Sequence, residues 1–218
     1  MECLIGMKFD GFSLIAHDNS AGRSVLVMKQ NQDKIFHLGD HLAMVVCGDT
    51  GDTVYFGEFI QKNLAYYRIK NGYSLSPSAA VNYTRHEMAK RLRQAPNLVN
   101  LIMTGYDEST KQTSLYFMDY LGTLADVPFA AHGYGSYFAL STLDRYHRSN
   151  MSKEEAEGLL LKCILEVQKR LVINLPSFSF YFVDENGVSS KRTVKTEPAK
   201  VVGESTGEQQ SEEMDVFV

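Results

Sequence analysis

The chain has 218 residues, of which 44% are hydrophobic and 22% are charged, so it can bury one sizeable core. These values exclude an intrinsically disordered protein and a miniprotein that depends on disulfide staples. The 22 basic and 26 acidic residues give a formal net charge of -4. This charge argues only weakly against a nucleic-acid partner, because affinity for phosphate depends on clustered Lys and Arg.

Most of the negative charge lies in the last part of the sequence. Residues 196–218 hold six acidic residues and one basic residue, Lys200, so this segment carries -5 and residues 1–195 carry about +1. The segment 203–213 has almost no apolar side chain to bury, so ordering it would cost entropy with little return. We therefore predict one folded domain over residues 1–195 and a flexible acidic tail over residues 196–218. A peptide motif ending in Phe217-Val218 is the alternative interpretation of the tail.

Targeting signals and metal motifs are not expected from the sequence. The start, Met1-Glu2-Cys3, has no basic region before an apolar run, and no uninterrupted apolar stretch approaches the ~20 residues that cross a bilayer. Cys3, Cys47 and Cys163 form no CxxC motif, which fits a reducing compartment. Because the six histidines are scattered and none stands at ligand spacing from a cysteine, we expect no metal site and no cofactor.

The first part of the chain has the pattern of two strand pairs. Apolar runs predict strands over residues 4–9 and 12–17, joined by Asp10-Gly11, a dipeptide that favours a tight hairpin turn. A second pair is expected over residues 34–38 and 42–47, and the latter is apolar throughout, as in a strand covered on both faces.

Two helices are expected next. The first covers residues 53–70 and carries two apolar stripes, which is more than one sheet face could cover. The second begins at Ser76-Pro77, a capping side chain followed by proline at the first helical position, and it stops before Pro96.

The remainder of the chain repeats this order of strands, helices and strands. A capping box at Ser152 and Glu155 marks the start of one of these helices. The expected strands cover residues 98–103, 114–119, 129–132, 178–183 and 188–194, and the expected helices cover residues 136–147 and 152–171. This order predicts an α+β fold, a four-layer αββα sandwich in which two antiparallel sheets pack face to face and helix pairs cover both outer faces. A doubly wound dinucleotide-binding fold is disfavoured because single strands and helices do not alternate.

Several segments together resemble the beta-type subunits of the proteasome. These segments are Leu4-Ile5-Gly6, Ala16-His17-Asp18, Lys34, residues 48–52 and residues 131–135. Residues 71–77, 120–121, 128–135 and 143–146 also resemble one particular member of that family. The resemblance covers about residues 1–194 and implies a sandwich of the N-terminal nucleophile hydrolase type.

The resemblance also implies where a catalytic site would lie. Active members have an N-terminal threonine as nucleophile, supported by a lysine, an aspartate, an oxyanion glycine and a distal Asp and Ser pair. Asp18, Lys34 and Gly48 match the supporting aspartate, the lysine and the glycine, and the same offset places Glu2 at the threonine position. Glu2 is not a poised nucleophile, and Met1 precedes it. We expect Asp18 and Lys34 to form a partly buried ion pair.

The distal positions differ from those of an active member as well. Tyr134 stands at the serine position of the glycine loop, and Leu171 and Asn174 stand where the distal Asp and Ser would be. We therefore expect no catalytic residue. The seven positions treated as vestiges of a family site are Glu2, Asp18, Lys34, Gly48, Tyr134, Leu171 and Asn174.

Cys3 offers an enzymatic alternative. A cysteine exposed by trimming two residues would be an N-terminal nucleophile close to Lys34. However, Cys3 is one position out of register on a strand, which reverses the face to which its side chain points. We also expect no propeptide whose removal would expose it.

The resemblance implies a non-catalytic structural subunit of the 20S proteasome core, which takes part in ATP- and ubiquitin-dependent protein degradation. Its expected partners are the other beta subunits of a seven-membered ring, the adjacent alpha ring and the opposite beta ring, with no nucleic acid and no membrane. The expected location is the cytoplasm and the nucleus. A scaffold that acts elsewhere through the acidic tail is a further alternative.

Overall fold

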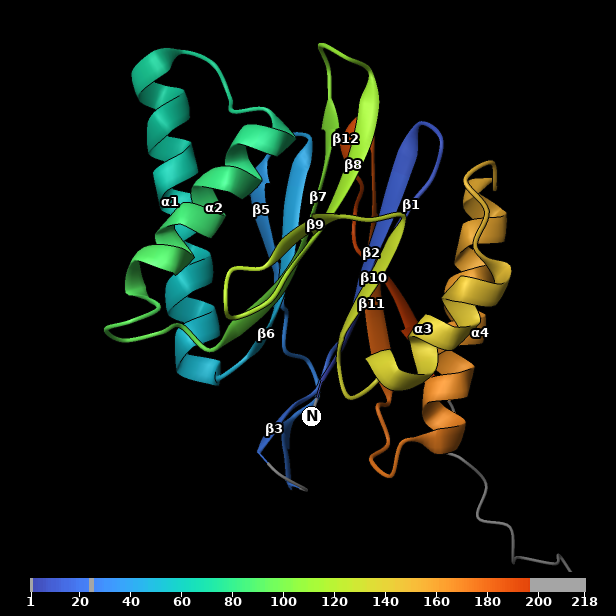
Figure 1. Ribbon diagram of the computed structural model, residues 1–218. Coiled ribbons are helices and arrows are strands. Elements are labelled where there is room, and N and C mark those ends of the chain that lie inside the picture. The colour runs from blue at the N-terminus through green and yellow to red at the C-terminus, as the bar shows by residue number, and fades with distance from the viewer. Residues whose placement is uncertain (1, 24–25, 197–218) are drawn as a thin grey trace, which may run out of the picture.

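Two antiparallel sheets face each other at the centre of the computed structural model, which describes residues 2–23 and 26–196 (Figure 1). The first sheet has the order β10-β1-β2-β11-β12, and β13 also pairs with β11. The second sheet has the order β5-β6-β7-β8-β9. The strands of the first sheet are β1 (Cys3–Lys8), β2 (Phe12–Asp18), β10 (Phe129–Gly133), β11 (Ser177–Asp184), β12 (Gly187–Val188) and β13 (Arg192–Lys195). Those of the second are β5 (Ile35–Gly39), β6 (Leu42–Gly48), β7 (Val99–Asp107), β8 (Gln112–Met118) and β9 (Leu124–Asp126).

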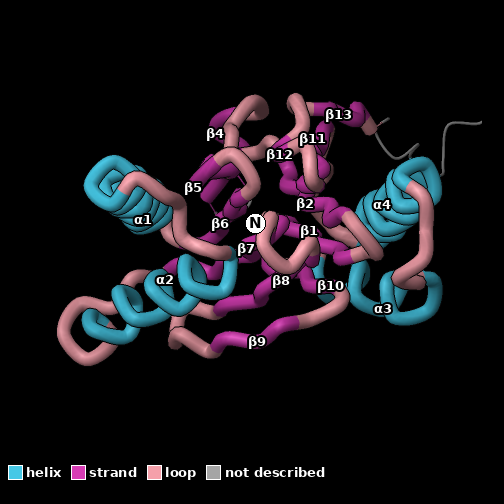
Figure 2. Tube along the Cα trace, turned by 90° about the horizontal axis from the view of Figure 1, so that it is seen from above, coloured by secondary structure: helices cyan, strands magenta, loops and turns pink. Residues whose placement is uncertain are grey.

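Four helices cover the outer faces of the two sheets, which Figure 2 shows from above. They are α1 (Thr50–Asn71) and α2 (Pro77–Arg91) on the second sheet, and α3 (Ser136–Tyr146) and α4 (Lys153–Arg170) on the first. The α+β fold and the four-layer αββα sandwich predicted from the sequence are thereby confirmed.

Three apolar layers hold the sandwich together, and β1 shows how the sequence divides between them. Leu4 points between the sheets, whereas Cys3, Ile5 and Met7 point into the layer under α3 and α4. Successive side chains on a strand point to opposite faces, so a strand covered on both faces is apolar at every position. This is why residues 4–7 and 42–47 include no polar side chain.

Local signals explain where the helices begin and end. The side chain of Asp49 accepts a hydrogen bond from Gly51 N–H at the start of α1. Ser76 caps α2 through Ala79 N–H, and Ser152 and Glu155 form both halves of the capping box that opens α4. The predicted starts of these last two helices are confirmed, while α1 begins three residues earlier than expected.

Three strands were not predicted, and one prediction was wrong. The unpredicted strands are β9 and the hairpin of β3 (Ala21–Arg23) and β4 (Leu26–Lys29), which projects beyond the sandwich in Figure 1. The expected strand over residues 188–194 divides into β12 and β13, which pair with different parts of β11. Apart from Thr196, the predicted tail lies outside the described residues, so its flexibility stays a prediction.

Candidate functional site

Four of the residues singled out from the sequence meet at one end of the sandwich. Glu2 precedes β1 and Asp18 ends β2, and these strands are antiparallel neighbours. Lys34 precedes β5 and Gly48 ends β6, which are antiparallel neighbours in the other sheet. Antiparallel pairing places the start of one strand beside the end of the next, so each sheet contributes two of the four residues.

Lys34 is the centre of this group. Its Nζ lies 2.9 Å from Asp18 Oδ1, 3.0 Å from Asp18 Oδ2 and 3.1 Å from Glu2 Oε1. Asp18 is fully buried and Lys34 is nearly so. The expected ion pair between Asp18 and Lys34 is therefore present, and it is buried rather than partly buried.

The charge of Lys34 is fixed by its neighbours. Burial alone would lower the pKa of Lys34, but the carboxylates of Asp18 and Glu2 act in the opposite direction, and the net result is a raised pKa. Lys34 is therefore an ammonium group at neutral pH, and a group in this state cannot accept a proton as a general base.

Asp18 is held in place by backbone donors that the sequence did not indicate. Its Oδ1 accepts a hydrogen bond of 2.8 Å from Cys3 N–H, and its Oδ2 accepts one of 3.0 Å from Ser20 N–H. A buried carboxylate needs such partners, since an unpaired buried charge is costly. These donors depend on the path of the chain and not on the types of the side chains, so no sequence signal marks them.

The backbone N–H of Gly48 points at the carboxylate of Glu2. Gly48 N–H donates a hydrogen bond of 2.8 Å to Glu2 Oε2, while the other carboxylate oxygen contacts Lys34. Gly48 has φ +141°, and a Cβ at this position would collide with the carbonyl oxygen of Leu98, so a side chain is strongly disfavoured here. The glycine that matches the oxyanion position thus has its donor occupied by the chain's own carboxylate.

A small pocket of about 80 Å³ adjoins this carboxylate. Its lining includes Glu2, Lys34, Gly48, Phe36 and Thr50. The polar groups that could polarise a bound carbonyl, Lys34 Nζ and Gly48 N–H, are both engaged by Glu2.

The distal family positions contribute nothing to this cluster. Tyr134 lies in the loop between β10 and α3, and its side chain is more than half exposed. Leu171 caps the end of α4 and packs against the apolar layer beneath that helix, and Asn174 is exposed in the following loop. In the part of the chain that the structure describes, the ion pairs and side-chain hydrogen bonds of Asp18 and Lys34 involve none of these three residues.

Cys3 faces away from the site. Its side chain is fully buried in the layer under α3 and α4, where a Cβ on Gly135 would collide with its Sγ. Burial, followed by the charge of Asp18, raises the pKa of the Cys3 thiol well above its ordinary value. Both the direction of the side chain and the neutral thiol argue against nucleophilic chemistry at Cys3.

A second polar contact involves His17 and Asp33, the residues that precede Asp18 and Lys34 in the sequence. His17 is fully buried, and its Nε2 lies 3.1 Å from Asp33 Oδ1, while Lys191 Nζ lies 3.0 Å from Asp33 Oδ2. The contact with His17, more than that with Lys191, holds the pKa of Asp33 well below its usual range. The pairing of Asp33 with Lys191 could not be predicted from the sequence, because these residues are 158 positions apart.

Within residues 2–23 and 26–196, no group of three or more His, Cys, Asp or Glu side chains is arranged to hold a metal ion. His37 and His41 are four residues apart, but His37 lies on β5 and His41 lies in the turn that follows it, so the two are not on one helix face. Over the same residues, no helix is both long and apolar enough to span a bilayer.

Comparison with known proteins gives one consistent family. The family model described as "Proteasome subunit" matches residues 2–183. Proteasome subunit beta type-2-A of Arabidopsis thaliana is 48% identical over 187 residues, which cover 86% of this chain and 91% of the relative. Proteasome subunit beta type-2 of Dictyostelium discoideum is 38% identical over 190 residues, 86% of this chain and 96% of the relative. Proteasome subunit beta type-4 of Saccharomyces cerevisiae is 35% identical over 189 residues, with the same coverages of 86% and 96%.

Proposed function

Because this chain belongs to the proteasome subunit family, we propose that it is a non-catalytic structural beta subunit of the 20S core particle. The family membership confirms the resemblance found in the sequence, and the αββα sandwich is the N-terminal nucleophile hydrolase fold that the resemblance implied. In this proposal the chain helps to form the proteolytic chamber and leaves peptide cleavage to its neighbours.

The observation that carries the proposal is the position of the Glu2 carboxylate. An acyl-transfer site needs a nucleophile and an unoccupied N–H donor where the oxyanion develops. Here Glu2 stands at the family's nucleophile position and its carboxylate accepts the Gly48 N–H at 2.8 Å. A negative charge at that point repels the oxyanion of a tetrahedral intermediate instead of stabilising it.

The state of Lys34 supports the same conclusion. With three carboxylate oxygens within 3.1 Å and a raised pKa, Lys34 is a structural cation that ties the two sheets together. The enzymatic alternative, an N-terminal nucleophile at Cys3, is not favoured, since the Cys3 side chain is fully buried on the opposite face of β1.

The proposal extends to partners and location. We infer that the chain takes one place in a seven-membered beta ring, between an alpha ring on one side and the opposite beta ring on the other. The particle that contains this chain would be located in the cytoplasm and the nucleus. There the chain would contribute to ATP- and ubiquitin-dependent protein degradation.

Labelling of the native particle with a peptide vinyl sulfone, an electrophile that traps catalytic threonine and cysteine residues, tests the proposal. We expect the probe to modify other subunits and to leave this chain at its unlabelled intact mass. The matched control is the same particle after denaturation, in which Cys3 becomes accessible. A covalent adduct on this chain in the native particle would overturn the non-catalytic assignment, and recovery of the chain only as a small free species would overturn the structural one.

A further inference from the structure

The sequence contains two Asn-Gly pairs, Asn71-Gly72 and Asn186-Gly187. In such a pair the backbone nitrogen of the glycine can attack the side-chain amide carbon of the asparagine and close a cyclic succinimide. The proton of that nitrogen leaves with the side-chain amino group as ammonia. Water then opens the ring to give aspartate or isoaspartate, in which the main chain runs through the former side chain. Glycine permits the attack because no side chain shields its nitrogen and its backbone is conformationally free.

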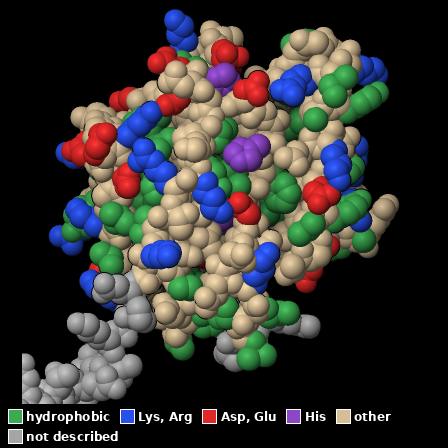
Figure 3. Space-filling model, turned by 180° about the vertical axis from the view of Figure 1, so that it is seen from behind, with side chains coloured by type: hydrophobic (Ala, Val, Ile, Leu, Met, Phe, Trp, Pro, Cys, Tyr) green, Lys and Arg blue, Asp and Glu red, His purple; other side chains and the backbone are tan. Residues whose placement is uncertain are grey.

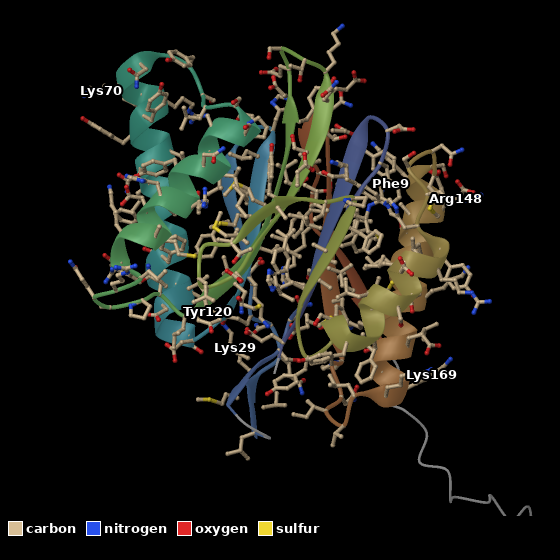
Figure 4. The ribbon with its side chains drawn as sticks, in the orientation of Figure 1. Phe9, Lys29, Lys70, Tyr120, Arg148 and Lys169 are labelled. Atoms are coloured by element: carbon tan, nitrogen blue, oxygen red, sulfur yellow. The ribbon has the colours of Figure 1, made fainter. Side chains whose placement is uncertain are left out.

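Asn71-Gly72 is held by the end of α1, where Figure 4 labels the preceding residue, Lys70. Gly72 N–H donates a hydrogen bond of 2.8 Å to the carbonyl of Arg68. The side-chain amide of Asn71 donates one of 2.9 Å to the carbonyl of Tyr67, so it points back along the helix and away from the Gly72 nitrogen. The end of α1 must therefore unwind before this pair can react.

Asn186-Gly187 lies in an exposed turn between β11 and β12, at the top of Figure 1. The main-chain N–H of Asn186 donates a hydrogen bond of 2.7 Å to Asp184 Oδ1. Among the described residues, the side-chain amide of Asn186 forms no hydrogen bond, so it can rotate toward the nitrogen of Gly187. β12 has two residues and pairs with β11 at two positions, so this turn can open without unfolding the rest of the sheet.

We propose that Asn186 is a deamidation site, which converts to aspartate or isoaspartate in the folded chain while Asn71 stays intact. The reaction consumes water and releases ammonia, and it needs no enzyme, oxidant or cofactor. The turn itself requires the reactive glycine, because Gly187 has φ +100° and a Cβ there would lie 2.7 Å from the carbonyl oxygen of Asp40. The inference concerns the chemistry of this chain alone, so it goes beyond the proposed function and does not depend on it.

Isoaspartate at position 186 would disturb the contact between two neighbouring turns. Val188 N–H donates a hydrogen bond of 2.9 Å to the carbonyl of Asp40. His41 Nε2–H donates one of 3.0 Å to the carbonyl of Glu185. Isoaspartate adds a methylene group to the main chain between Glu185 and Val188, so the two hydrogen bonds cannot both keep their geometry. The new carboxylate also adds negative charge at the end of the sandwich where Figure 3 shows acidic side chains, at the top. Deamidation should therefore release the turn between β11 and β12 from the turn between β5 and β6.

Peptide mass spectrometry of the full-length folded chain, aged in mildly alkaline buffer, tests the proposed site. We expect the deamidated fraction to grow about tenfold faster at Asn186 than at Asn71, because both reacting groups of Asn71-Gly72 are hydrogen-bonded within the helix end. In urea the two rates should become similar, since each asparagine precedes a glycine and the fold is lost. The peptide that contains Asn71 is thus an internal control. Similar rates in the folded chain, or a faster rate at Asn71, would overturn the proposal.

Hydrogen exchange measures the effect of the modification on the turn. The amide of Val188 should exchange faster in the aged chain than in the fresh chain, while the amides of β7 at the centre of its sheet keep their rates. Asn186→Gln is the matched control, because its longer side chain keeps the amide group but closes the corresponding ring far more slowly. Ageing should leave the Val188 amide of this variant unchanged. Faster exchange in aged Asn186→Gln, or unchanged exchange in the deamidated wild-type chain, would contradict the proposed release of the turn.

Discussion

The carboxylate of Glu2 accepts a hydrogen bond from the backbone N–H of Gly48 across the space between the two sheets. Glu2 precedes the first strand of one sheet and Gly48 ends a strand of the other, 46 residues further along the chain. Because of this contact, the Gly48 N–H is already hydrogen-bonded and is not free to bind the oxyanion of a reaction intermediate. Hydrogen exchange of the Gly48 amide can test the contact.

Glu2→Ala should expose the Gly48 amide to solvent. We expect the amide hydrogen of Gly48 to exchange faster with deuterium in Glu2→Ala than in the wild-type chain, as measured by NMR. Because the Glu2 side chain is 24% exposed, loss of its ion pair should lower the free energy of unfolding by only about 1 kcal/mol. Glu2→Gln is the control, since its amide oxygen can still accept the hydrogen bond. Equal exchange in all three proteins would show that the contact is absent in solution.

The buried pair of Asp18 and Lys34 should behave differently from the exposed ion pairs. Asp18→Asn removes the main partner of a buried ammonium group and should cost about 3–5 kcal/mol of unfolding free energy. The double variant Asp18→Asn/Lys34→Met has no unpaired charge at this position. Its loss of unfolding free energy should therefore be smaller, by about 1–3 kcal/mol, than the sum of the losses in the single variants Asp18→Asn and Lys34→Met. Urea titrations of the four proteins, followed by circular dichroism, measure this coupling, and strictly additive losses would contradict it.

The sequence predicted the elements that have strong local signals. The caps at Ser76 and Ser152 and the hairpin dipeptide Asp10-Gly11 act within a few residues, so they can be read without knowledge of the fold. The hairpin of β3 and β4 was missed because Leu26, Val27 and Met28 are all exposed, and exposed apolar residues do not show the alternation of a half-buried strand.

The site was predicted only in part. Family positions gave Glu2, Asp18, Lys34 and Gly48, but the engagement of Gly48 N–H by Glu2 depends on how the two sheets pack, which no local pattern records. The contact of the buried His17 with the half-exposed Asp33 escaped prediction for the same reason.

The three cysteines should resist alkylation in the folded chain. Burial raises the pKa of the Cys163 thiol to about 12, and it also raises that of Cys3 well above its ordinary value, so little thiolate forms at pH 8. We expect iodoacetamide to leave Cys3 unmodified in the native protein and to modify it fully in urea, as followed by peptide mass spectrometry. Rapid native labelling at Cys3 would revive the enzymatic alternative. Labelling at Cys47 or Cys163 in the same sample would indicate general unfolding instead.

His132 should make the fold sensitive to mild acid. It lies between the sheets, stacked on Phe117 at 4.2 Å, and burial lowers its pKa to about 4. The unfolded chain, with a pKa of about 6.5 at this residue, binds a proton first as the pH falls, so stability is lost between about pH 6.5 and 4. From pH 7.5 to pH 5 this one group should lower the unfolding free energy by about 2 kcal/mol.

Comparison with His132→Gln isolates this effect from the titration of the carboxylates. The variant should be less stable than the wild-type chain at pH 7.5, because it loses the stacking on Phe117, but its stability should fall less between pH 7.5 and pH 5. Urea unfolding of both proteins at the two pH values measures the difference, which should be about 2 kcal/mol. If the two proteins lose the same stability over this range, the prediction is wrong. His132 would then be protonated as readily in the folded chain as in the unfolded one, and water would reach its site between the sheets.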